Sequence, residues 1–346
     1  MKHQTTRYGE IPFYKIGTFG NTADAFISKK LFLEYKTKYS FPKKGDILIS
    51  ASGTIGRAVI YDGKPAYFQD SNIVWIDNDE TLVKNDFLFY AYSNVKWNTE
   101  HTTILRLYND NFRNTLIPLP PLNEQNAIAN ILSGLDRYLC ALDALILKKE
   151  GVKKALSFEL LSQRKRLKGF NQAWQRVRLG DIANYLTSNL SVEQITQQGK
   201  IKVYDANNFI GYTDTTFISD KPYISIIKDG SVGRVRILPP KANILSTMGA
   251  LIANHRTTTE FLFYLLSNFD FKNFTSGSII PHIYFKDYKE KTIFLPSLNE
   301  QIAIANILSA LDKEIASLKN KKRQFENIKK ALNHDLMSAK IRVLKK

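Results

Sequence analysis

LNEQNAIANILSGLD, residues 122–136, recurs almost unchanged as LNEQIAIANILSALD, residues 298–312. The two copies agree at 13 of 15 positions without a gap, so position 122 corresponds to position 298 and the offset stays constant along the stretch. A repeat this close indicates duplication of one structural unit. We therefore predict that the chain consists of two related halves, each built on one copy of this stretch.

Each copy is expected to open a long helix. Asn123 and Asn299 are suitable N-cap residues, and a glutamate follows each in the first turn, where a negative charge favours the helix dipole. Apolar residues then recur in alternating steps of four and three, which is the heptad pattern of a coiled coil. The predicted helix-pairing residues are Ile128, Leu132, Leu135, Leu139 and Leu142 in the first copy, and Ile304, Leu308, Leu311, Ile315 and Leu318 in the second.

A heptad pattern is also typical of ordinary core packing or of a generic coiled coil. Here the two runs are near copies that each follow a similar globular segment, which favours packing of one helix on the other. Because a whole domain connects them, the helices can run antiparallel around a pseudo-twofold axis. A first helix from Asn123 to about Arg166 would be ~65 Å long at ~1.5 Å per residue. The pair is expected to form a coiled-coil spacer between the globular domains.

The composition is that of a folded, strongly basic protein. Among 346 residues 44% are hydrophobic, and 49 lysines and arginines outnumber 32 aspartates and glutamates, giving a net charge of +17. This excess favours a polyanionic partner, nucleic acid before membrane. There is no apolar run of membrane-spanning length and no signal-peptide pattern, and the single Cys140 excludes disulfides within the chain and Cys-rich zinc sites. We expect a soluble, cytoplasmic protein.

The segments before the two helices repeat the same order of signals. Short runs of β-forming residues flank a Gly-x-x-Gly-Arg element at residues 53–57 and again at 230–234. A short apolar helix expected at residues 87–92 has its counterpart at 261–264, while the residues between these shared signals differ. We predict an α/β (α+β) protein whose two domains share one fold and bind different versions of one ligand type. The expected boundaries are 1–121 for the first domain, 122–168 for its helix, 169–297 for the second domain and 298–346 for its helix.

The two halves differ at their start. The second domain opens with WQRVRLGDI at residues 174–182, and reaches IKVY at residues 201–204 only after another turn-rich stretch. The first domain begins almost directly with the comparable IPFY at residues 11–14. We therefore expect the first domain to have no counterpart of this opening segment.

Together these features resemble the specificity (S) subunits of type I restriction-modification systems, over essentially the whole chain. The resemblance rests on the Trp…Leu-Gly-Asp-Ile opening at residues 174–182, on Gly-Asp-Ile-Leu and Gly-Thr-Ile-Gly-Arg within residues 45–57, on PLPPLNEQ at residues 118–125, and on the duplicated Ile-Ala-Asn-Ile-Leu helix. It implies that each target-recognition domain reads one part of a bipartite, asymmetric site in double-stranded DNA, and that the helices set the spacer between the parts.

The resemblance also implies partners. Methyltransferase (modification) subunits would dock on the helical region, and restriction subunits would join that core. S-adenosylmethionine, ATP and Mg are then expected on the partner subunits, with no cofactor on this chain. The missing opening of the first domain departs from the family pattern, and points to a shortened gene product, a shuffled allele or an alternative start. Each of these would put the activity of the first domain in question.

If the ligand is DNA, lysines and arginines on phosphates supply most of the affinity, and side chains on base edges read the sequence. Arginine suits guanine, and asparagine or glutamine suits adenine, because their forked geometry makes two hydrogen bonds to one base edge. The candidate DNA-binding residues lie in loops that differ between the matching frameworks. They are Ser52, Thr54, Arg57, Gln69, Asn72, Arg106, Tyr108 and Asn109 in the first domain, and Lys228, Ser231, Arg234, Arg236, His282 and Tyr284 in the second.

No catalytic or metal-binding pattern is recognisable. The Gly-x-x-Gly-Arg elements are typical of hairpin turns in which glycine supplies a positive φ; a phosphate cradle is the alternative, although the lysine of a P-loop is absent. The five histidines have no metal-ligand spacing, and no nucleophile or methyltransferase motif is present. We predict a non-catalytic DNA-recognition subunit.

Two alternatives belong to other classes. An inactive or shortened specificity allele could act as an interaction scaffold, for which uniform, strongly salt-dependent DNA binding is expected. A nuclease with unrecognised carboxylates would instead show metal-dependent cleavage by the purified chain. Sequence-dependent binding in the presence of partners distinguishes base recognition from both.

Overall fold

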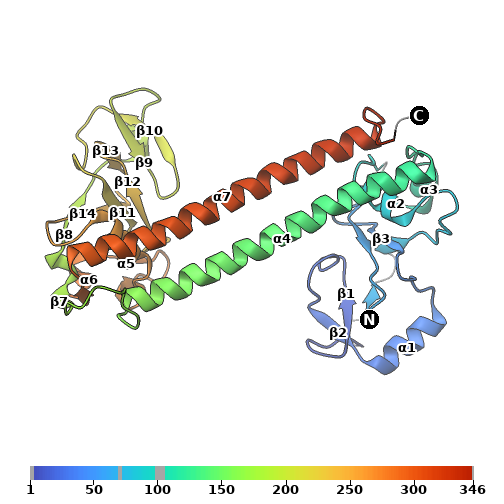
Figure 1. Ribbon diagram of the computed structural model, residues 1–346, viewed down its shortest axis with the longest axis horizontal. Coiled ribbons are helices and arrows are strands. Elements are labelled where there is room, and N and C mark those ends of the chain that lie inside the picture. The colour runs from blue at the N-terminus through green and yellow to red at the C-terminus, as the bar shows by residue number, and fades with distance from the viewer. Residues whose placement is uncertain (1–3, 69–71, 98–105, 345–346) are drawn as a thin grey trace. The chain divides into compact units, whose positions relative to one another are not determined.

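The computed structural model describes residues 4–68, 72–97 and 106–344, and the chain divides into two compact units. Unit 1 comprises Met1–Asp143 and Asn320–Lys346, and unit 2 comprises Ala144–Lys319. Two uninterrupted helices of 40 residues, α4 (Leu122–Leu161) and α7 (Leu298–Met337), each contribute residues to both units (Figure 1). Every unit therefore contains one globular domain and a stretch of both long helices.

The long helices begin and end slightly differently from the prediction. Each starts one residue before the expected N-cap, so Asn123 and Asn299 lie inside the first turn and the N-cap prediction was wrong. The carbonyl of Pro121 accepts hydrogen bonds from the backbone of Glu124 and Gln125 at 2.9 and 3.0 Å, which starts the helix earlier. Helix α4 ends at Leu161 rather than near Arg166; 40 residues correspond to ~60 Å.

The long helices run antiparallel within each unit, as predicted. In unit 1, ion pairs join Asp136 to Lys329 and Asp143 to Lys322, so residue numbers rise along α4 as they fall along α7. In unit 2, Lys153 pairs with Asp312, and Glu150 pairs with Lys319. The Asp136–Lys329 and Asp312–Lys153 pairs are equivalent under the offset of the sequence repeat, so the duplication includes contacts between the helices.

The second domain consists of small, mainly antiparallel sheets. Its central sheet has the order β12-β11-β14-β8, a second sheet has the order β10-β9-β13, and β7 pairs with β17 and β15 with β16. Only the β9–β13 pair is parallel among these. The bounds are β7 (Gln175–Arg178), β8 (Ala183–Thr187), β9 (Ile201–Tyr204), β10 (Phe209–Thr213), β11 (Tyr223–Ile227), β12 (Val235–Leu238), β13 (Ala242–Ile244), β14 (Met248–Ala253), α5 (Thr259–Ser267), β15 (Thr275–Ser276), β16 (His282–Ile283), α6 (Phe285–Tyr288) and β17 (Thr292–Leu295).

The first domain repeats part of this plan. Its sheets have the orders β4-β3-β6 and β2-β1-β5, which match β12-β11-β14 and β10-β9-β13. Within the described residues, β6 pairs only with β3, and no strand corresponds to β7 or β8. The bounds are β1 (Ile11–Tyr14), β2 (Ala25–Ile27), α1 (Lys29–Lys38), β3 (Ile47–Ser50), β4 (Ala58–Ile60), β5 (Tyr67–Phe68), β6 (Ile73–Trp75), α2 (Asn85–Tyr92) and α3 (Asn109–Arg113).

The Gly-x-x-Gly-Arg elements form the turns of the β3–β4 and β11–β12 hairpins, as predicted. All four glycines, including Gly56 and Gly233, have φ between 67° and 86°, a conformation that glycine adopts without strain. A Cβ on Gly56 would lie 2.2 Å from the indole nitrogen of Trp97, and one on Gly233 would lie 2.6 Å from the Phe271 ring. Each turn is therefore covered by an aromatic ring, and a side chain at these glycines would displace it.

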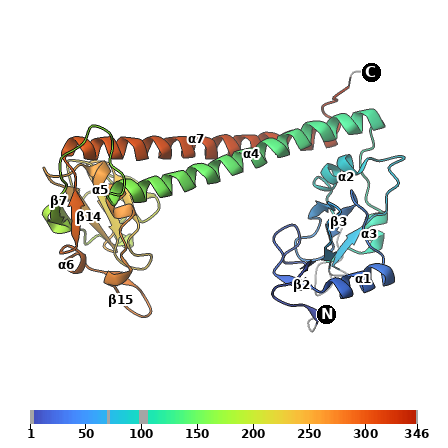
Figure 2. The same ribbon diagram turned by 60° about the horizontal axis from the view of Figure 1, so that its bottom comes forward.

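Each globular domain packs onto the start of its following helix through a short apolar helix (Figure 2). In unit 2, Phe261 of α5 shares a core with Ile304 and Leu308 of α7. In unit 1, Phe87 of α2 shares a core with Leu132 of α4, and Leu336 of α7 joins the same cluster. The predicted helix-pairing residues Ile128, Leu142 and Ile315 are also buried, while Leu135, Leu139, Leu311 and Leu318 are half-buried.

The long helices combine apolar and charged residues. Among the described helices, none carries an apolar stretch long enough to cross a membrane.

Candidate nucleic-acid interface

Four of the predicted residues of the first domain come together where β3 and β6 meet the segment before α3. Ser52 follows β3, forms an isolated bridge with Arg106, and donates a hydrogen bond from its hydroxyl to Asn72 Oδ1 at 2.9 Å. The guanidinium of Arg106 lies 5.8 Å from the ring centre of Tyr108. We call Ser52, Asn72, Arg106 and Tyr108 the first polar cluster.

The second domain has a cluster in the equivalent place. Asp229 follows β11 and forms an isolated bridge with His282, and the two side chains are joined at 2.7 Å between Oδ1 and Nδ1. Tyr284 stacks near His282 with ring centres 6.4 Å apart. We call Lys228, Asp229, His282 and Tyr284 the second polar cluster. Asp229 was not among the predicted residues; its alignment with Ser52 was the signal that could have identified it.

The same backbone framework holds both clusters. In the first domain, Leu107 N donates to Ala51 O at 2.8 Å, and Ala51 N donates to Asn72 O at 2.8 Å. In the second domain, Ile283 N donates to Lys228 O at 2.9 Å, and Lys228 N donates to Thr247 O at 3.1 Å. The framework is therefore shared, whereas the side chains that it presents differ in charge and in hydrogen-bonding type.

Other predicted residues lie apart from these clusters. Arg57 donates from its guanidinium to Phe19 O at 2.9 Å, and Arg236 donates to Asn207 O at 2.9 Å while lying 5.3 Å from the Tyr204 ring. Both guanidiniums thus hold loops of their own domain. Thr54, Ser231 and Arg234 are exposed in the hairpin turns, Asn109 is exposed at the start of α3, and Gln69 lies outside the described residues.

The duplicated stretch contributes polar residues that fasten each domain to its helix. Gln301 is fully buried, and its amide donates to Arg256 O and Pro296 O at 3.0 Å each while accepting from Thr258 N at 3.0 Å. Its equivalent, Gln125, is also fully buried. It donates to Leu82 O at 3.0 Å and Pro120 O at 2.8 Å, and accepts from Lys84 N at 2.8 Å. Each glutamine satisfies three backbone groups at the junction between domain and helix.

The preceding glutamate of each copy binds an arginine near the end of the opposite helix. Glu300 accepts from Arg166 at 2.7 and 2.8 Å and from the Trp174 indole at 2.9 Å, and Glu124 accepts from Arg342 at 2.6 and 3.3 Å. The two arginines are again equivalent under the offset of the repeat. The hydrogen bonds and charge of Arg342 hold the pKa of the Glu124 carboxyl below its ordinary value.

The final aspartate of each copy accepts a tyrosine hydroxyl from the domain. Tyr90 donates to Asp136 at 2.7 Å, and Tyr264 donates to Asp312 at 2.9 Å. Burial, followed by the hydrogen bond to the neighbouring carboxylate, raises the pKa of both phenols. Sequence reasoning gave the glutamates only a favourable interaction with the helix dipole and assigned no role to the glutamines and aspartates, although their identity in both copies was a usable signal.

Replacing Arg342 by glutamine is expected to remove an acid-dependent part of the stability of unit 1. Because the folded-state pKa of Glu124 is lowered, its contribution is present above its ordinary value of 4.5 and is lost as the pH falls through the folded-state pKa. The difference in urea midpoint between the wild type and Arg342→Gln should be largest near pH 7 and should shrink on acidification. A difference that is constant from pH 7 to pH 3 would contradict this.

No group of three or more histidine, cysteine, aspartate or glutamate side chains among the described residues is arranged to hold a metal ion.

Comparison with known proteins identifies the family. The model of the type I restriction modification DNA specificity domain matches residues 1–149 and 171–327. A Haemophilus influenzae protein named as a type I restriction enzyme specificity subunit is 65% identical over 133 residues, which are 38% of this chain and 34% of that relative. The type I restriction enzyme MjaVIII specificity subunit of Methanocaldococcus jannaschii is 25% identical over 362 aligned positions, covering 92% of this chain and 84% of the relative.

Solved structures agree in fold. The S subunit of a type I restriction-modification system from M. genitalium superposes with a TM-score of 0.63 at 21% identity, covering 97% of this chain and 91% of that chain. A chain from a structural study of complex assembly and conformational transition of a type I system has a TM-score of 0.53 at 16% identity, covering 85% of this chain and 82% of that chain. With the family model matching two segments that together make up most of the sequence, the chain belongs to the type I restriction-modification specificity subunits and carries two specificity domains.

Proposed function

We propose that each specificity domain reads one part of a bipartite site in double-stranded DNA, and that the two polar clusters contribute to this recognition. The observation that carries the proposal is the shared backbone framework with different side chains. Ser52, Asn72 and Arg106 stand where the second domain has Asp229, Thr247 and His282. Two domains that hold different donors and acceptors in one geometry are suited to reading different base edges in the same way.

The side chains of the clusters have the chemistry that base recognition needs. Arg106 and Asn72 can each make two hydrogen bonds to a base edge, with guanine and adenine as the respective preferred bases. His282 is held by Asp229 at 2.7 Å, which fixes the orientation of its ring and leaves the second ring nitrogen for a ligand. The net charge of +17 supplies attraction to phosphates that does not depend on sequence.

On this proposal the chain is a non-catalytic subunit whose role is to place its partner subunits on the DNA site. It would bring modification subunits to the site, and restriction subunits would join the same complex. Those partners would supply S-adenosylmethionine, ATP, Mg and the reacting groups. The helices α4 and α7 would set the number of base pairs between the two recognised parts.

Genome-wide methylation mapping tests the proposal in cells that express the cognate modification subunit with and without this chain. A bipartite methylated motif should appear only when the chain is present. His282→Ala should relax the bases of one part, and Arg106→Ala should relax the bases of the other, because each mismatch or lost base contact costs ~1–3 kcal/mol.

His255→Ala is the matched control for His282→Ala. His255 is exposed in the turn before α5, outside both polar clusters, so its replacement should leave the motif unchanged. Methylation that is independent of the chain, or a motif that is unaltered by both cluster variants, would contradict the proposal.

A further inference from the structure

The hairpin of β15 and β16 in the second domain ends in an apolar tip. Ser276 pairs with His282, so residues 277–281, with the sequence GSIIP, form the loop. Ile279 is 92% exposed, and Ile280 beside it is 55% exposed. Single exposed apolar residues are common on protein surfaces, but tight loops are normally occupied by Gly, Pro, Asn, Asp and Ser. The tip therefore presents an adjacent apolar pair that the rest of the second domain does not cover.

Gly277 gives this loop a compact shape. Its φ is 90°, a conformation that glycine adopts without strain. A Cβ in its place would collide with the carbonyl oxygen of Ile280 and would lie 3.0 Å from His282 Cδ2. The backbone of the loop therefore folds closely over Gly277, and the loop lies against the ring of His282. The apolar pair is thus presented by a tight turn beside the second polar cluster.

The base of the hairpin is fixed to the domain on both strands. Ile283 of β16 is buried, and Pro281 O accepts a hydrogen bond from Gly230 N of the β11–β12 turn at 2.9 Å. Before β15, the ring of Phe274 stacks on that of Phe269 with ring centres 5.7 Å apart. The tip therefore projects from a fixed base, which reduces the conformational entropy that is lost when a ligand binds.

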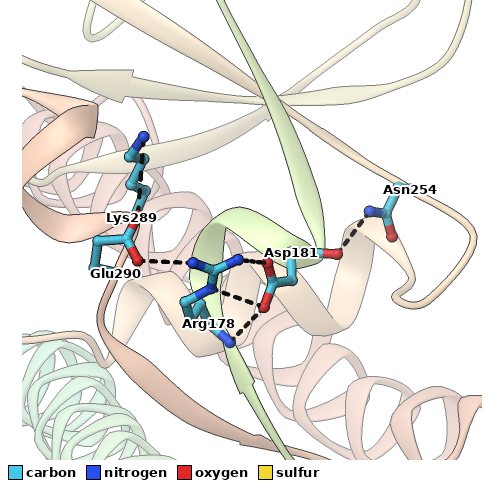
Figure 3. A network of polar contacts seen from close by, with 5 residues as sticks. All are labelled: Arg178, Asp181, Asn254, Lys289 and Glu290. Atoms are coloured by element: carbon cyan, nitrogen blue, oxygen red, sulfur yellow. Dashed lines mark hydrogen bonds and ion pairs between the residues drawn. The ribbon is translucent and has the colours of Figure 1, made fainter.

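Polar contacts also fasten the chain that follows the hairpin. Helix α6 comes directly after β16, and the next residue, Lys289, accepts a hydrogen bond at its backbone oxygen from Gly180 N at 2.8 Å. The guanidinium of Arg178 lies between Asp181 and Glu290, with contacts of 2.9 and 3.1 Å (Figure 3). The exit from the hairpin is therefore tied to the turn between β7 and β8.

The surroundings of the tip favour an anionic ligand. Residues 271–286 contain no aspartate or glutamate, and Lys272 and Lys286 are exposed on either side of the hairpin in the sequence. Ser276 and Ser278 are exposed near the tip. Lysines and hydroxyls of this kind bind DNA phosphates. The hairpin also lies at the end of the second domain that is remote from the unit 2 stretches of α4 and α7 (Figure 2), on which partner subunits are expected.

A two-stranded hairpin of this kind fits the major groove of DNA. The major groove is ~12 Å wide and admits a two-stranded β-ribbon, whereas the minor groove is ~6 Å wide. Of the groups that distinguish the base pairs in the major groove, the C5 methyl of thymine is apolar and the others are hydrogen-bond donors or acceptors. An exposed aliphatic side chain at the tip is therefore complementary to that methyl group and not to the polar base edges.

We propose that this hairpin enters the major groove and that Ile279 reads a thymine through its C5 methyl group, next to the base pair that His282 contacts. The inference rests on the proposed function, because it takes double-stranded DNA as the ligand of the second polar cluster, and it adds one residue and one base to that function. Contact with Ile279 removes the methyl group from water. A base without this methyl group leaves Ile279 uncovered, so the position favours thymine. One hairpin thus carries a polar and an apolar base contact.

The test uses the complex of the full chain with its cognate modification subunits, and duplexes that carry the methylated motif. Each thymine of the half-site that His282→Ala relaxes is replaced in turn by uracil, which removes the methyl group and keeps the base pair. One replacement should weaken binding about fourfold, the effect of one buried methyl or methylene group. Ile279→Ala should bind the thymine and uracil duplexes equally, and Ile279→Val should retain the preference for thymine. Phe294→Ala is the matched control, because Phe294 is 51% exposed on β17, outside the hairpin, and it should bind like the wild type.

A half-site of the second domain that specifies no A·T base pair would overturn the inference and leave the proposed function intact. The same holds for a uracil effect of equal size in the wild type and in Ile279→Ala, and for the absence of a uracil effect at every thymine. Weaker association of Ile279→Ala with the modification subunits would assign the tip to a protein partner and would also overturn the inference. Failure of the proposed function differs from these results, because matched and scrambled duplexes then bind equally with or without Ile279, and the inference falls with it.

Discussion

Leu308→Asp is expected to unfold unit 2. Leu308 is fully buried in the cluster that α5, α7 and Leu160 of α4 form with the second domain. Loss of a large aliphatic side chain from a core costs ~2–5 kcal/mol, and an unpaired carboxylate in the same place adds a desolvation cost. The sum approaches the whole stability of a typical domain, ~5–15 kcal/mol. Leu132→Asp should act in the same way on unit 1, because Leu132 is fully buried between α2 and the end of α7.

Matched controls lie on the same helices at more exposed positions. Ile131 and Ile302 are 40% and 46% exposed, so Ile131→Asp and Ile302→Asp should leave the free energy of unfolding nearly unchanged. Urea unfolding followed by circular dichroism at 222 nm should show a lost or strongly shifted transition for Leu308→Asp and Leu132→Asp, and an unchanged one for the two controls. Equal midpoints for Leu308→Asp and Ile302→Asp would show that the cluster does not stabilise the unit.

The heptad residues have two roles: they pack against the opposite long helix and against the globular domain. The apolar pattern alone cannot reveal the second role. A heptad repeat predicts that one side of a helix is buried, but it does not say against which element. Leu132 and Leu308 contact both the globular domain and the opposite helix because each domain places a short helix beside the start of the next long one. The duplicated sequence predicted two halves correctly, and the antiparallel helices followed from the length of the connection between them.

The sequence analysis failed on the helix N-caps and on helix α1, for different reasons. Asn123 is a good N-cap by type, yet the carbonyl of Pro121 already accepts the first helical hydrogen bonds, and the asparagine side chain bonds to Glu124 N at 2.9 Å instead. Helix α1 was not predicted, since Phe32 is its single buried residue and an apolar stripe is therefore weak. Its N-cap, Ser28, accepts from Leu31 N at 3.2 Å, a signal that the sequence did contain.

The sequence could indicate which segments form the candidate interface, but not how each side chain in them is placed. Alignment of the two domains pointed to Ser52, Arg106 and His282, because Ser52 precedes the shared Gly-x-x-Gly-Arg element and Arg106 and His282 occupy the same position of the aligned Arg-Leu-Tyr and His-Ile-Tyr runs. It could not show that Arg57 turns to the carbonyl of Phe19, since that loop is distant in sequence. It also missed Asp229, because an aspartate is an unusual choice for contact with an anionic ligand. The contact between Asp229 and His282 forms only in the tertiary structure, and the sequence does not reveal it.

Lengthening both long helices by one heptad is expected to change the spacer of the methylated motif while leaving both half-site sequences unchanged. The division between the units falls after Asp143 in α4 and after Lys319 in α7. A heptad inserted at both points therefore preserves the contacts within each unit, including Asp143 with Lys322 and Glu150 with Lys319. A heptad also preserves the apolar seam to within ~20°.

The size of the change follows from the geometry of both polymers. One helical heptad adds ~10 Å, and base pairs are spaced by ~3.4 Å along duplex DNA, so the spacer should lengthen by at most about three base pairs. Insertion into α4 alone is the control, because the Asp143–Lys322 and Glu150–Lys319 pairs cannot both persist beside an unaltered α7, and methylation should fall. Methylation mapping distinguishes the cases. An unchanged spacer in the double insertion would mean that the distance between the two recognised parts is set elsewhere than in α4 and α7, whereas altered half-site sequences would mean that the helices also shape the domains' recognition of bases.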